Sequence, residues 1–219
     1  MKDLVIIGAG GFGREVAWLI DEINHNQKQW NLLGFLDENP SLHGQELNGY
    51  PVLGGLGWLR GKGVSCVVAI GEPVAKKNVI QSLINDQISF ATLIHPDVHP
   101  SSSVTFGEGC IVCAGTILTV NVEIGNHVIL NLGCTIGHDV SIGDYATILP
   151  GVNVSGAVVI SEEVSVGTGS AIIQGVTIGT GTIVGAGAVV TRSLPAHCTA
   201  VGSPAKPIKF HHHDGHEAF

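Results

Sequence analysis

The sequence is poor in charged residues, which make up only 13% of its 219 residues, and aromatic residues account for just 5%. Ten Lys and Arg stand against 18 Asp and Glu, so the formal net charge is −8. A chain with this balance lacks the basic surface that nucleic-acid binding requires. No apolar run approaches the length of a membrane-spanning helix, so we expect no membrane insertion.

The sequence also shows neither the cysteine pattern of a disulfide framework nor a recognisable secretion signal. The five cysteines form an odd, scattered set, unlike the paired cysteines of secreted scaffolds: Cys66, Cys110, Cys113, Cys134 and Cys198. The apolar opening, residues 1–7, runs directly into glycines without the small-residue cleavage site of a signal peptide. We therefore expect a reduced, cytoplasmic protein.

Glycine, in contrast, is abundant, with 31 residues, and 44% of the chain is hydrophobic. The hydrophobic fraction argues against disorder, so the glycines indicate a backbone with many tight turns.

The first half alternates strand-like and helix-like segments. Residues 4–7, 32–36 and 66–70 have the composition of strands, and residues 14–23 and 73–84 have helical spacing. A glycine turn, residues 8–13, follows the first strand, and residues 37–40 form a turn signal after the second. This order predicts an α/β half-Rossmann domain over residues 1–92, with helices on the faces of a small parallel sheet.

From about residue 94 an aliphatic residue recurs every six positions without a slip. Counting from Ile94 to Val190, 15 of 17 register positions are Leu, Ile or Val, and the exceptions are Pro100 and Phe106. Neither a helix nor a simple strand has a period of six, whereas a short strand plus a turn does. The pattern is the hexapeptide signature of an all-β parallel β-helix, predicted here over residues 93–200.

Three hexapeptides form one coil of roughly 18 residues, and coils stack at the strand spacing of roughly 4.8 Å. The register aliphatics are expected to point inward. The segment 194–209 leaves the repeat and is expected to cover the open end of the β-helix, and residues 201–219 are expected to form a C-terminal cap and tail. Its last stretch, residues 211–216, is rich in histidine and is expected to be solvated.

His138 and Asp139 stand out as an ionisable pair at a turn of the repeat, where most positions hold small residues. A neutral imidazole can accept a proton near pH 7, and a neighbouring carboxylate can orient it. One full coil further along is Gly156, which should therefore lie over His138 and could offer its N–H to an oxyanion. The alternative is that His138 and Asp139 are simply neighbouring surface residues without a catalytic role.

The loop of residues 8–13 follows a strand and opens a helix, which suits phosphate binding on backbone N–H groups. Asp37, at the end of the second strand, could accept a hydrogen bond from a ribose or a base. Because the chain shows no redox centre, we expect nucleotide binding without hydride transfer.

Two other patterns are weaker. Cys110 and Cys113 have CxxC spacing, but Cys110 occupies a small-residue position of the repeat, so packing is the better interpretation. His95, His99 and His127 suggest the metal site of γ-class carbonic anhydrases, but no three histidines fall on a convincing pattern. We expect no metal.

Several motifs, in this order, resemble the bacterial sugar O/N-acyltransferase family, which includes sialic acid O-acetyltransferases and UDP-4-amino-sugar N-acetyltransferases. The motifs are residues 8–13, 35–38, 68–71, 93–96, 131–139 and 202–206. The resemblance implies a left-handed β-helix, a homotrimer with active sites between subunits, acetyl-CoA as acyl donor and a nucleotide-linked sugar as acceptor in surface glycan biosynthesis.

The resemblance also implies site residues. His138 would be the general base and Asp139 would raise its basicity, while Asn131 would place the acceptor and Gly156 would face the acetyl carbonyl. The nucleotide sugar would contact Gly10, Gly11, Phe12, Asp37, Glu38 and Gly71. CoA would be bordered by Thr147, Gly156, Thr168, Ala186, Gly202, Pro204, Ala205 and Lys206.

Two departures from the family pattern leave the acceptor open. Some amino-sugar members carry a His at the position of Phe12, and a second His near the thioester at the position of Thr147. The choice between amine and hydroxyl therefore stays open. So do two alternatives: an O-acetyltransferase on a non-nucleotide acceptor of the sialic acid or serine type, and a non-catalytic β-helix scaffold.

Overall fold

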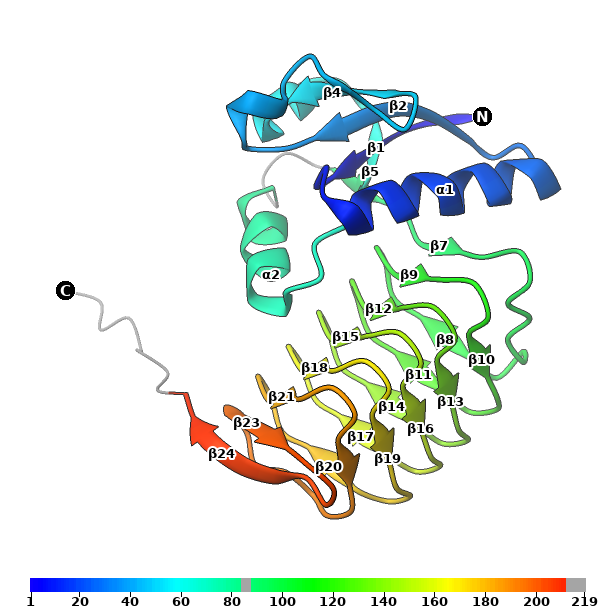
Figure 1. Ribbon diagram of the computed structural model, residues 1–219. Coiled ribbons are helices and arrows are strands. Elements are labelled where there is room, and N and C mark those ends of the chain that lie inside the picture. The colour runs from blue at the N-terminus through cyan, green and yellow to red at the C-terminus, as the bar shows by residue number, and fades with distance from the viewer. Residues whose placement is uncertain (84–87, 212–219) are drawn as a thin grey trace.

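The computed structural model describes residues 1–83 and 88–211, and it has two parts (Figure 1). The N-terminal part is built on a six-stranded sheet in the order β3-β4-β2-β1-β5-β6. All its pairings are parallel except β3 with β4. Its elements are β1 (Lys2–Ile7), α1 (Gly11–Asn26), β2 (Trp30–Leu36), η1 (Pro40–Leu42), β3 (Glu46–Leu47), β4 (Tyr50–Gly54), η2 (Leu56–Leu59), β5 (Ser65–Val68), α2 (Pro73–Ser82) and β6 (Ser89–Phe90).

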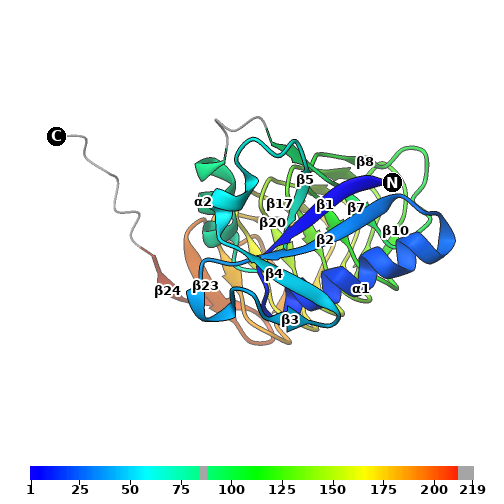
Figure 2. The ribbon, with the colours of Figure 1, turned by 90° about the horizontal axis from the view of Figure 1, so that it is seen from above.

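The predicted strands and helices of the first half are present, and the α/β assignment is confirmed (Figure 2). The last four residues of β1 are buried, as expected of a central parallel strand. Helix α1 begins at Gly11, earlier than expected, so the second half of the predicted glycine turn is helical. A Cβ on Gly13 would collide with the carbonyl oxygen of Gly8, so glycine lets the helix approach the strand closely. The end of the predicted second helix, Ile84, lies outside the described residues.

The C-terminal part is a left-handed parallel β-helix, as predicted (Figure 1). Its strands are short, and from β8 to β22 they recur every six residues: β7 (Leu93–Ile94), β8 (Thr105–Phe106), β9 (Ile111–Val112), β10 (Ile117–Leu118), β11 (Glu123–Ile124), β12 (Ile129–Leu130), β13 (Thr135–Ile136), β14 (Ser141–Ile142), β15 (Thr147–Ile148), β16 (Asn153–Val154), β17 (Val159–Ile160), β18 (Ser165–Val166), β19 (Ala171–Ile172), β20 (Thr177–Ile178), β21 (Ile183–Val184), β22 (Val189–Val190), β23 (Cys198–Val201) and β24 (Lys206–Phe210).

Each strand pairs with its equivalent in the next coil, for example Ile136 with Val154 and Ile142 with Ile160. The second residue of the strands β9 to β22 is the register aliphatic, and all of these residues are buried in one continuous core. Proline at position 100 coincides with the one register position of the first coil that forms no strand. Proline has no N–H to donate to a ladder, which accounts for the gap.

The strands form three sheets, which we name by one member each. The β12 sheet has the order β24-β23-β21-β18-β15-β12-β9-β7, the β13 sheet has β10-β13-β16-β19-β22, and the β14 sheet has β20-β17-β14-β11-β8. Turns join the sheets at three corners, which recur once in every coil. The first corner contains residues 131–134, the second residues 137–140 and the third residues 143–146, with their equivalents in the other coils.

The segment after β22 continues the stack with a shortened period. Leu194 bridges to Ile178, and Thr199 of β23 pairs with Ile183, so both partners come two positions earlier than a full coil would place them. Strand β24 then turns back antiparallel to β23. The predicted C-terminal segment therefore extends one sheet by an edge strand, and residues 212–216 of the histidine-rich stretch lie outside the described residues.

The N-terminal part rests on the outer face of the β12 sheet. Ile111 and Ile129 point out of the β-helix and are buried in a cluster with α1 and β1 residues such as Ile20 and Leu4. On the side of α2, the Lys76 amine donates hydrogen bonds to Thr147 Oγ1 at 2.9 Å and to the Ala146 carbonyl oxygen at 3.3 Å. No helix among the described residues is long and apolar enough to cross a bilayer.

The buried Lys76 amine predicts a pH-dependent stability. Burial lowers the pKa of Lys76 from 10.5 to about 7. Between these values the unfolded chain binds one more proton than the folded chain, so this amine makes the free energy of unfolding rise with pH. Lys76→Met should remove a contribution of about 1.4 kcal/mol per pH unit in this window. Urea unfolding at pH 7.5 and 9.5 measures it.

Lys28→Met, at an exposed position of the same domain, is the control and should leave the slope as in the wild type. Equal slopes for the wild type and Lys76→Met would show that the buried amine does not titrate between the two pH values.

Candidate active site

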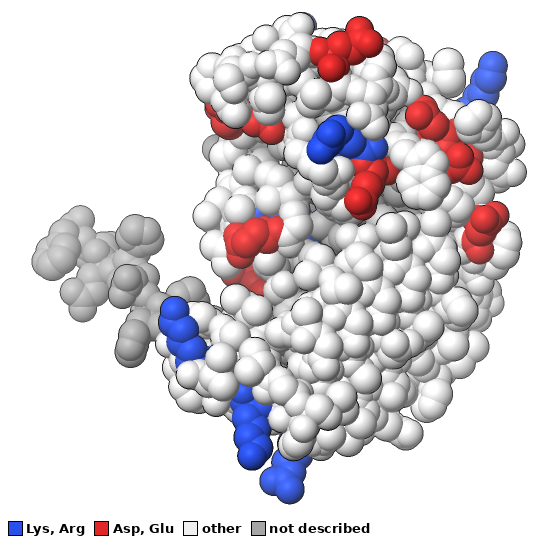
Figure 3. Space-filling model, viewed as in Figure 1, with Lys and Arg blue, Asp and Glu red and all other residues white. Residues whose placement is uncertain are grey.

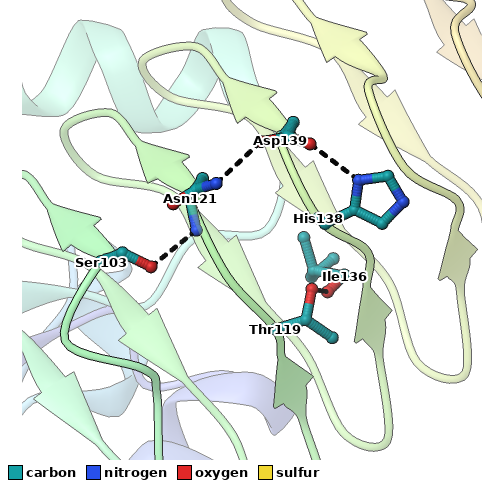
Figure 4. Close-up of polar contacts among 6 residues, drawn as sticks. All are labelled: Ser103, Thr119, Asn121, Ile136, His138 and Asp139. Carbon is teal, nitrogen blue, oxygen red and sulfur yellow. Dashed lines mark hydrogen bonds and ion pairs between the residues drawn. The ribbon is translucent and has the colours of Figure 1, made fainter.

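His138 and Asp139 lie together at the second corner, just after β13 (Figure 4). The His138 Nδ1 atom is 2.8 Å from Asp139 Oδ2, and the two side chains are 53% and 54% exposed. The prediction that these neighbours form a pair agrees with this geometry. Asp139 has a φ of 58°, a left-handed conformation that Asp and Asn adopt more readily than most residues. The sharp turn brings its carboxylate back against the preceding imidazole.

The hydrogen bond determines which imidazole nitrogen is free. A carboxylate can only accept, so Nδ1 carries the proton and Nε2 keeps its lone pair. The hydrogen bond from His138, and a second from the Asn121 side chain, lower the pKa of the Asp139 carboxyl. Asp139 therefore stays ionised at neutral pH, and Nε2 of His138 is the atom able to take a proton.

Gly156 lies against the His138 ring, where the spacing of one coil places it. A Cβ built on Gly156 would lie 2.5 Å from both Cε1 and Nε2 of the imidazole. The two turns are also joined by a hydrogen bond from the Ala157 N–H to the His138 carbonyl oxygen at 2.8 Å. Gly156 itself is buried, with the imidazole packed on the side where a Cβ would lie.

Asn131 lies at a different corner from His138. It follows β12 at the first corner, is 7% exposed, and its Oδ1 accepts a 2.7 Å hydrogen bond from the Leu132 N–H. Within one chain the structure therefore does not bring Asn131 to the imidazole.

Six of the eight residues predicted to border CoA lie in a column along the same first corner, and Gly156, beside His138 at the second corner, does not. Thr168 and Ala186 are exposed, one coil apart, and linked by the Gly187 N–H, which donates to the Thr168 carbonyl oxygen at 2.8 Å. Gly202 takes the next place in the column, because β23 pairs with β21. Gly202 accepts from the Val189 N–H, and the Ala205 N–H donates to the Val189 carbonyl oxygen. Pro204 and Lys206 are exposed on this turn and at the start of β24.

Thr147 does not belong to this column. It lies on the β12 sheet, is only 1% exposed, and accepts the hydrogen bond from Lys76. In this chain its hydroxyl holds α2 against the β-helix.

The predicted nucleotide-sugar residues gather at the carboxyl edge of the N-terminal sheet. Gly8 donates its N–H to the Leu36 carbonyl oxygen, and Asp37 Oδ2 accepts from the Ala9 N–H at 2.9 Å. Gly10 and Gly11 are exposed where α1 begins, and Phe12 is half-buried beside them. Glu38 Oε1 accepts from the Leu56 N–H at 2.6 Å, so this carboxylate caps η2.

Gly71, after β5, lines a cavity of about 510 Å³ between α2 and the β12 sheet. From the other side the cavity is lined by Leu149, Ser165 and Ile183. No other residue of the predicted site borders it, and it lies apart from the His138 corner.

The two cysteines of the CxxC spacing, together with His95 and His127, are buried packing residues, whereas His99 is exposed. Cys110 and Cys113 are buried free thiols, and burial raises their pKa values to about 11 and 12, so neither is a thiolate at neutral pH. His95 and His127 are 5% and 3% exposed. Within residues 1–83 and 88–211, no group of three or more His, Cys, Asp or Glu could hold a metal ion.

Two polar residues that support the His138–Asp139 pair are not predicted from the sequence. Asn121 is bonded to Asp139, and Ser103 is bonded to Asn121, each one coil from the next. The signal that could have found them is the same period that located Gly156. Lys76 left no such signal, because its partner Thr147 is 71 positions away.

Comparisons with known proteins agree with this architecture. Residues 3–83 match the family model of the PglD N-terminal domain. The chain is 33% identical to PerB from Caulobacter crescentus, whose structure contains CoA and GDP-perosamine, with a TM-score of 0.84 over 94% of this chain and 97% of that one. The chain belongs to the bacterial sugar O/N-acyltransferase family. It is an acyltransferase, which overturns the alternative of a non-catalytic scaffold.

Two further family members are similar over their whole length. The acetyltransferase domain of PglB from Neisseria gonorrhoeae, in complex with acetyl coenzyme A, is 30% identical with a TM-score of 0.85, over 94% of this chain and 99% of that one. WeeI from Acinetobacter baumannii is 32% identical with a TM-score of 0.83, over 95% and 100% of the two chains. No curated protein matched the sequence.

The contact between Gly156 and the imidazole predicts the effect of a single methyl group. Gly156→Ala would place a Cβ 2.5 Å from Nε2, so the ring must rotate away. Acyl transfer should fall by roughly tenfold to a hundredfold, because small misplacements of a reacting group are costly. Steady-state assays measure this. Gly57→Ala, whose Cβ would meet nothing within 4 Å, is the control. Wild-type turnover in Gly156→Ala would show that acyl transfer does not depend on the position of the His138 ring.

Proposed function

We propose that the protein transfers an acetyl group from acetyl-CoA to an amino or hydroxyl group of a nucleotide-linked sugar, with His138 as general base. The observation that carries the proposal is the His138–Asp139 pair, which engages Nδ1 and leaves Nε2 without an intramolecular partner at an exposed corner. Support also comes from PerB, which holds CoA and GDP-perosamine, and from the PglB domain, which holds acetyl coenzyme A. The product would serve the biosynthesis of bacterial surface glycans.

The proposed reaction is a direct transfer. The acceptor nitrogen or oxygen attacks the thioester carbonyl carbon while Nε2 of His138 removes its proton. The Gly156 N–H would stabilise the oxyanion of the tetrahedral intermediate. The C–S bond then breaks, and the imidazolium returns the proton to the departing thiolate of CoA. Asp139 stabilises the imidazolium during the step.

We place the donor along the first corner, against Thr168, Ala186 and the turn of residues 202–206. Lys and Arg gather near this end of the β-helix, whereas the coils above are almost free of charge in the same view (Figure 3). Lys206 is exposed there and could meet the phosphates of CoA. The nucleotide of the acceptor would bind at the carboxyl edge of the N-terminal sheet, so that residues 1–92 act as the nucleotide-sugar-binding domain and residues 93–200 as the acyltransferase domain.

The base and the donor column lie at different corners of one chain. We therefore propose a homotrimer in which the second corner of one subunit faces the first corner of its neighbour. Asn131 would then reach the acceptor bound against the neighbouring subunit's imidazole. The five buried free thiols fit a reducing, cytoplasmic location, where acetyl-CoA and nucleotide sugars are made.

A thiol-release assay tests the proposal. Acetyl-CoA is offered with GDP-, UDP- and dTDP-linked amino sugars, and with free sialic acid and serine. His138→Ala should keep acetyl-CoA binding in calorimetry and lose turnover by a factor on the order of a hundred or more. Near wild-type turnover in this variant would exclude the role of His138. Turnover with sialic acid or serine alone would favour the alternative of an O-acetyltransferase on a non-nucleotide acceptor.

Asp139→Asn should be milder than His138→Ala. The neutral amide no longer stabilises the imidazolium, so the rise of activity with pH should move to lower pH. An unchanged profile would count against Asp139 as the orienting group.

A further inference from the structure

We propose that Asn121 is a positioning residue of the active site, which holds the Asp139 carboxylate in the orientation that fixes the His138 imidazole. The proposal rests on the proposed role of His138 as general base. Asn121 lies at the second corner, one coil before Asp139, and its side chain approaches the face of the carboxylate opposite the imidazole (Figure 4).

The Asp139 carboxylate has one partner for each oxygen. Oδ2 accepts from His138 Nδ1 at 2.8 Å, and Oδ1 accepts from Asn121 Nδ2 at 3.0 Å. Asp139 is 54% exposed, so packing does not hold its side chain. Two hydrogen bonds on opposite sides of the carboxylate fix its plane, and this plane determines where the imidazole can lie. With Asn121 removed, the carboxylate could turn toward water and release the ring.

Asn121 is itself held in place by the preceding coil. Its N–H donates to Ser103 Oγ at 2.8 Å, and Ser103 Oγ lies 3.2 Å from Ser101 Oγ. The result is a hydrogen-bonded column of Ser103, Asn121 and Asp139, each one coil from the next (Figure 4).

The choice of Asn at this position meets two requirements at once. Asn121 has a φ of 55°, in the left-handed region that Asn tolerates better than most residues. Its amide also supplies the N–H donor that an ionised carboxylate needs, which an Asp of the same shape could not. Glycine would meet the first requirement only. Substitution of Asn121 by Gly or by Asp therefore keeps the left-handed backbone conformation and removes the N–H donor.

Asn121→Gly keeps the left-handed backbone and removes the donor. We expect kcat to fall by about tenfold, the lower end of what loss of an outer partner of an active-site imidazole costs. KM for acetyl-CoA should change less than about twofold, because Asn121 is hydrogen-bonded to Ser103 and Asp139 and not to a residue of the donor column. Asn121→Asp should lose more activity, because its carboxylate repels that of Asp139. Wild-type kcat in both variants would overturn the proposal.

A double-mutant cycle with Asp139→Asn separates positioning from a general structural effect. If Asn121 acts through the carboxylate, Asn121→Gly should cause no further loss of kcat in the Asp139→Asn background. A higher kcat in the double variant than in Asp139→Asn would support the same conclusion. In Asp139→Asn, the Asn121 amide would attract the side-chain oxygen of the substituted residue and so turn its NH2 group toward the imidazole, and Asn121→Gly would relieve this. A second tenfold loss in the double variant would show that Asn121 acts independently of Asp139 and would overturn the proposal.

The chain offers a matched control at the third corner. Asn126 donates through Nδ2 to both carboxylate oxygens of Asp144, at 3.3 and 3.2 Å, again across one coil. Asn126→Ala removes the same kind of contact away from His138 and should leave kcat unchanged, even where the melting temperature falls. An equal loss of kcat in both variants would mean that Asn121 acts through the stability of the coils.

The two failures can be told apart. Loss of turnover in His138→Ala, together with full activity in Asn121→Gly, leaves the proposed function in place and removes only the role of Asn121. Full activity in His138→Ala removes both.

Discussion

The constant period of the coils, three hexapeptides to a turn, is the constraint on which the rest of the structure depends. It exists because an aliphatic residue at every sixth position must be buried, and three short strands close one turn around the common core. A single inserted residue would shift every later side chain from the inner to the outer face of its strand, or the reverse. Because the register does not slip from β9 to β22, each residue at a corner has its equivalent in the next coil directly above it.

Columns of stacked residues are the functional consequence of this constraint. At the second corner the column of Ser103, Asn121 and Asp139 ends beside the imidazole, which lies on Gly156. At the first corner Thr168, Ala186 and Gly202 form another column. A hydrogen bond within a column costs little conformational entropy, because the backbone hydrogen bonds between coils already fix both turns. The same winding that makes such columns rigid also keeps the two corners apart within one chain.

Much of this arrangement could be predicted from the sequence, because the hexapeptide register is explicit. Counting one coil onward from His138 leads to Gly156, and the structure brings the two together. The same count backwards from Asp139 leads to Asn121, yet a lone Asn among turn residues did not suggest a partner. Thr147 was harder still: its environment is made by Lys76 from another domain, and no periodicity relates these two positions. The two-residue strands β3 and β6 are too short to carry a pattern, and neighbouring strands determine them.

Subunit complementation tests most directly the central claim that the base and the donor column come from different copies. His138→Ala lacks the proposed base, and Ala186→Trp blocks the exposed column at the first corner, so each variant alone should be inactive. After the two variants are co-refolded in equal amounts, the account predicts that about a quarter of the sites combine an intact imidazole with an intact column. Thiol release near that fraction of the wild-type rate is the expected result. A mixture as inactive as the two parent variants would contradict the account, because base and donor column would then belong to one chain.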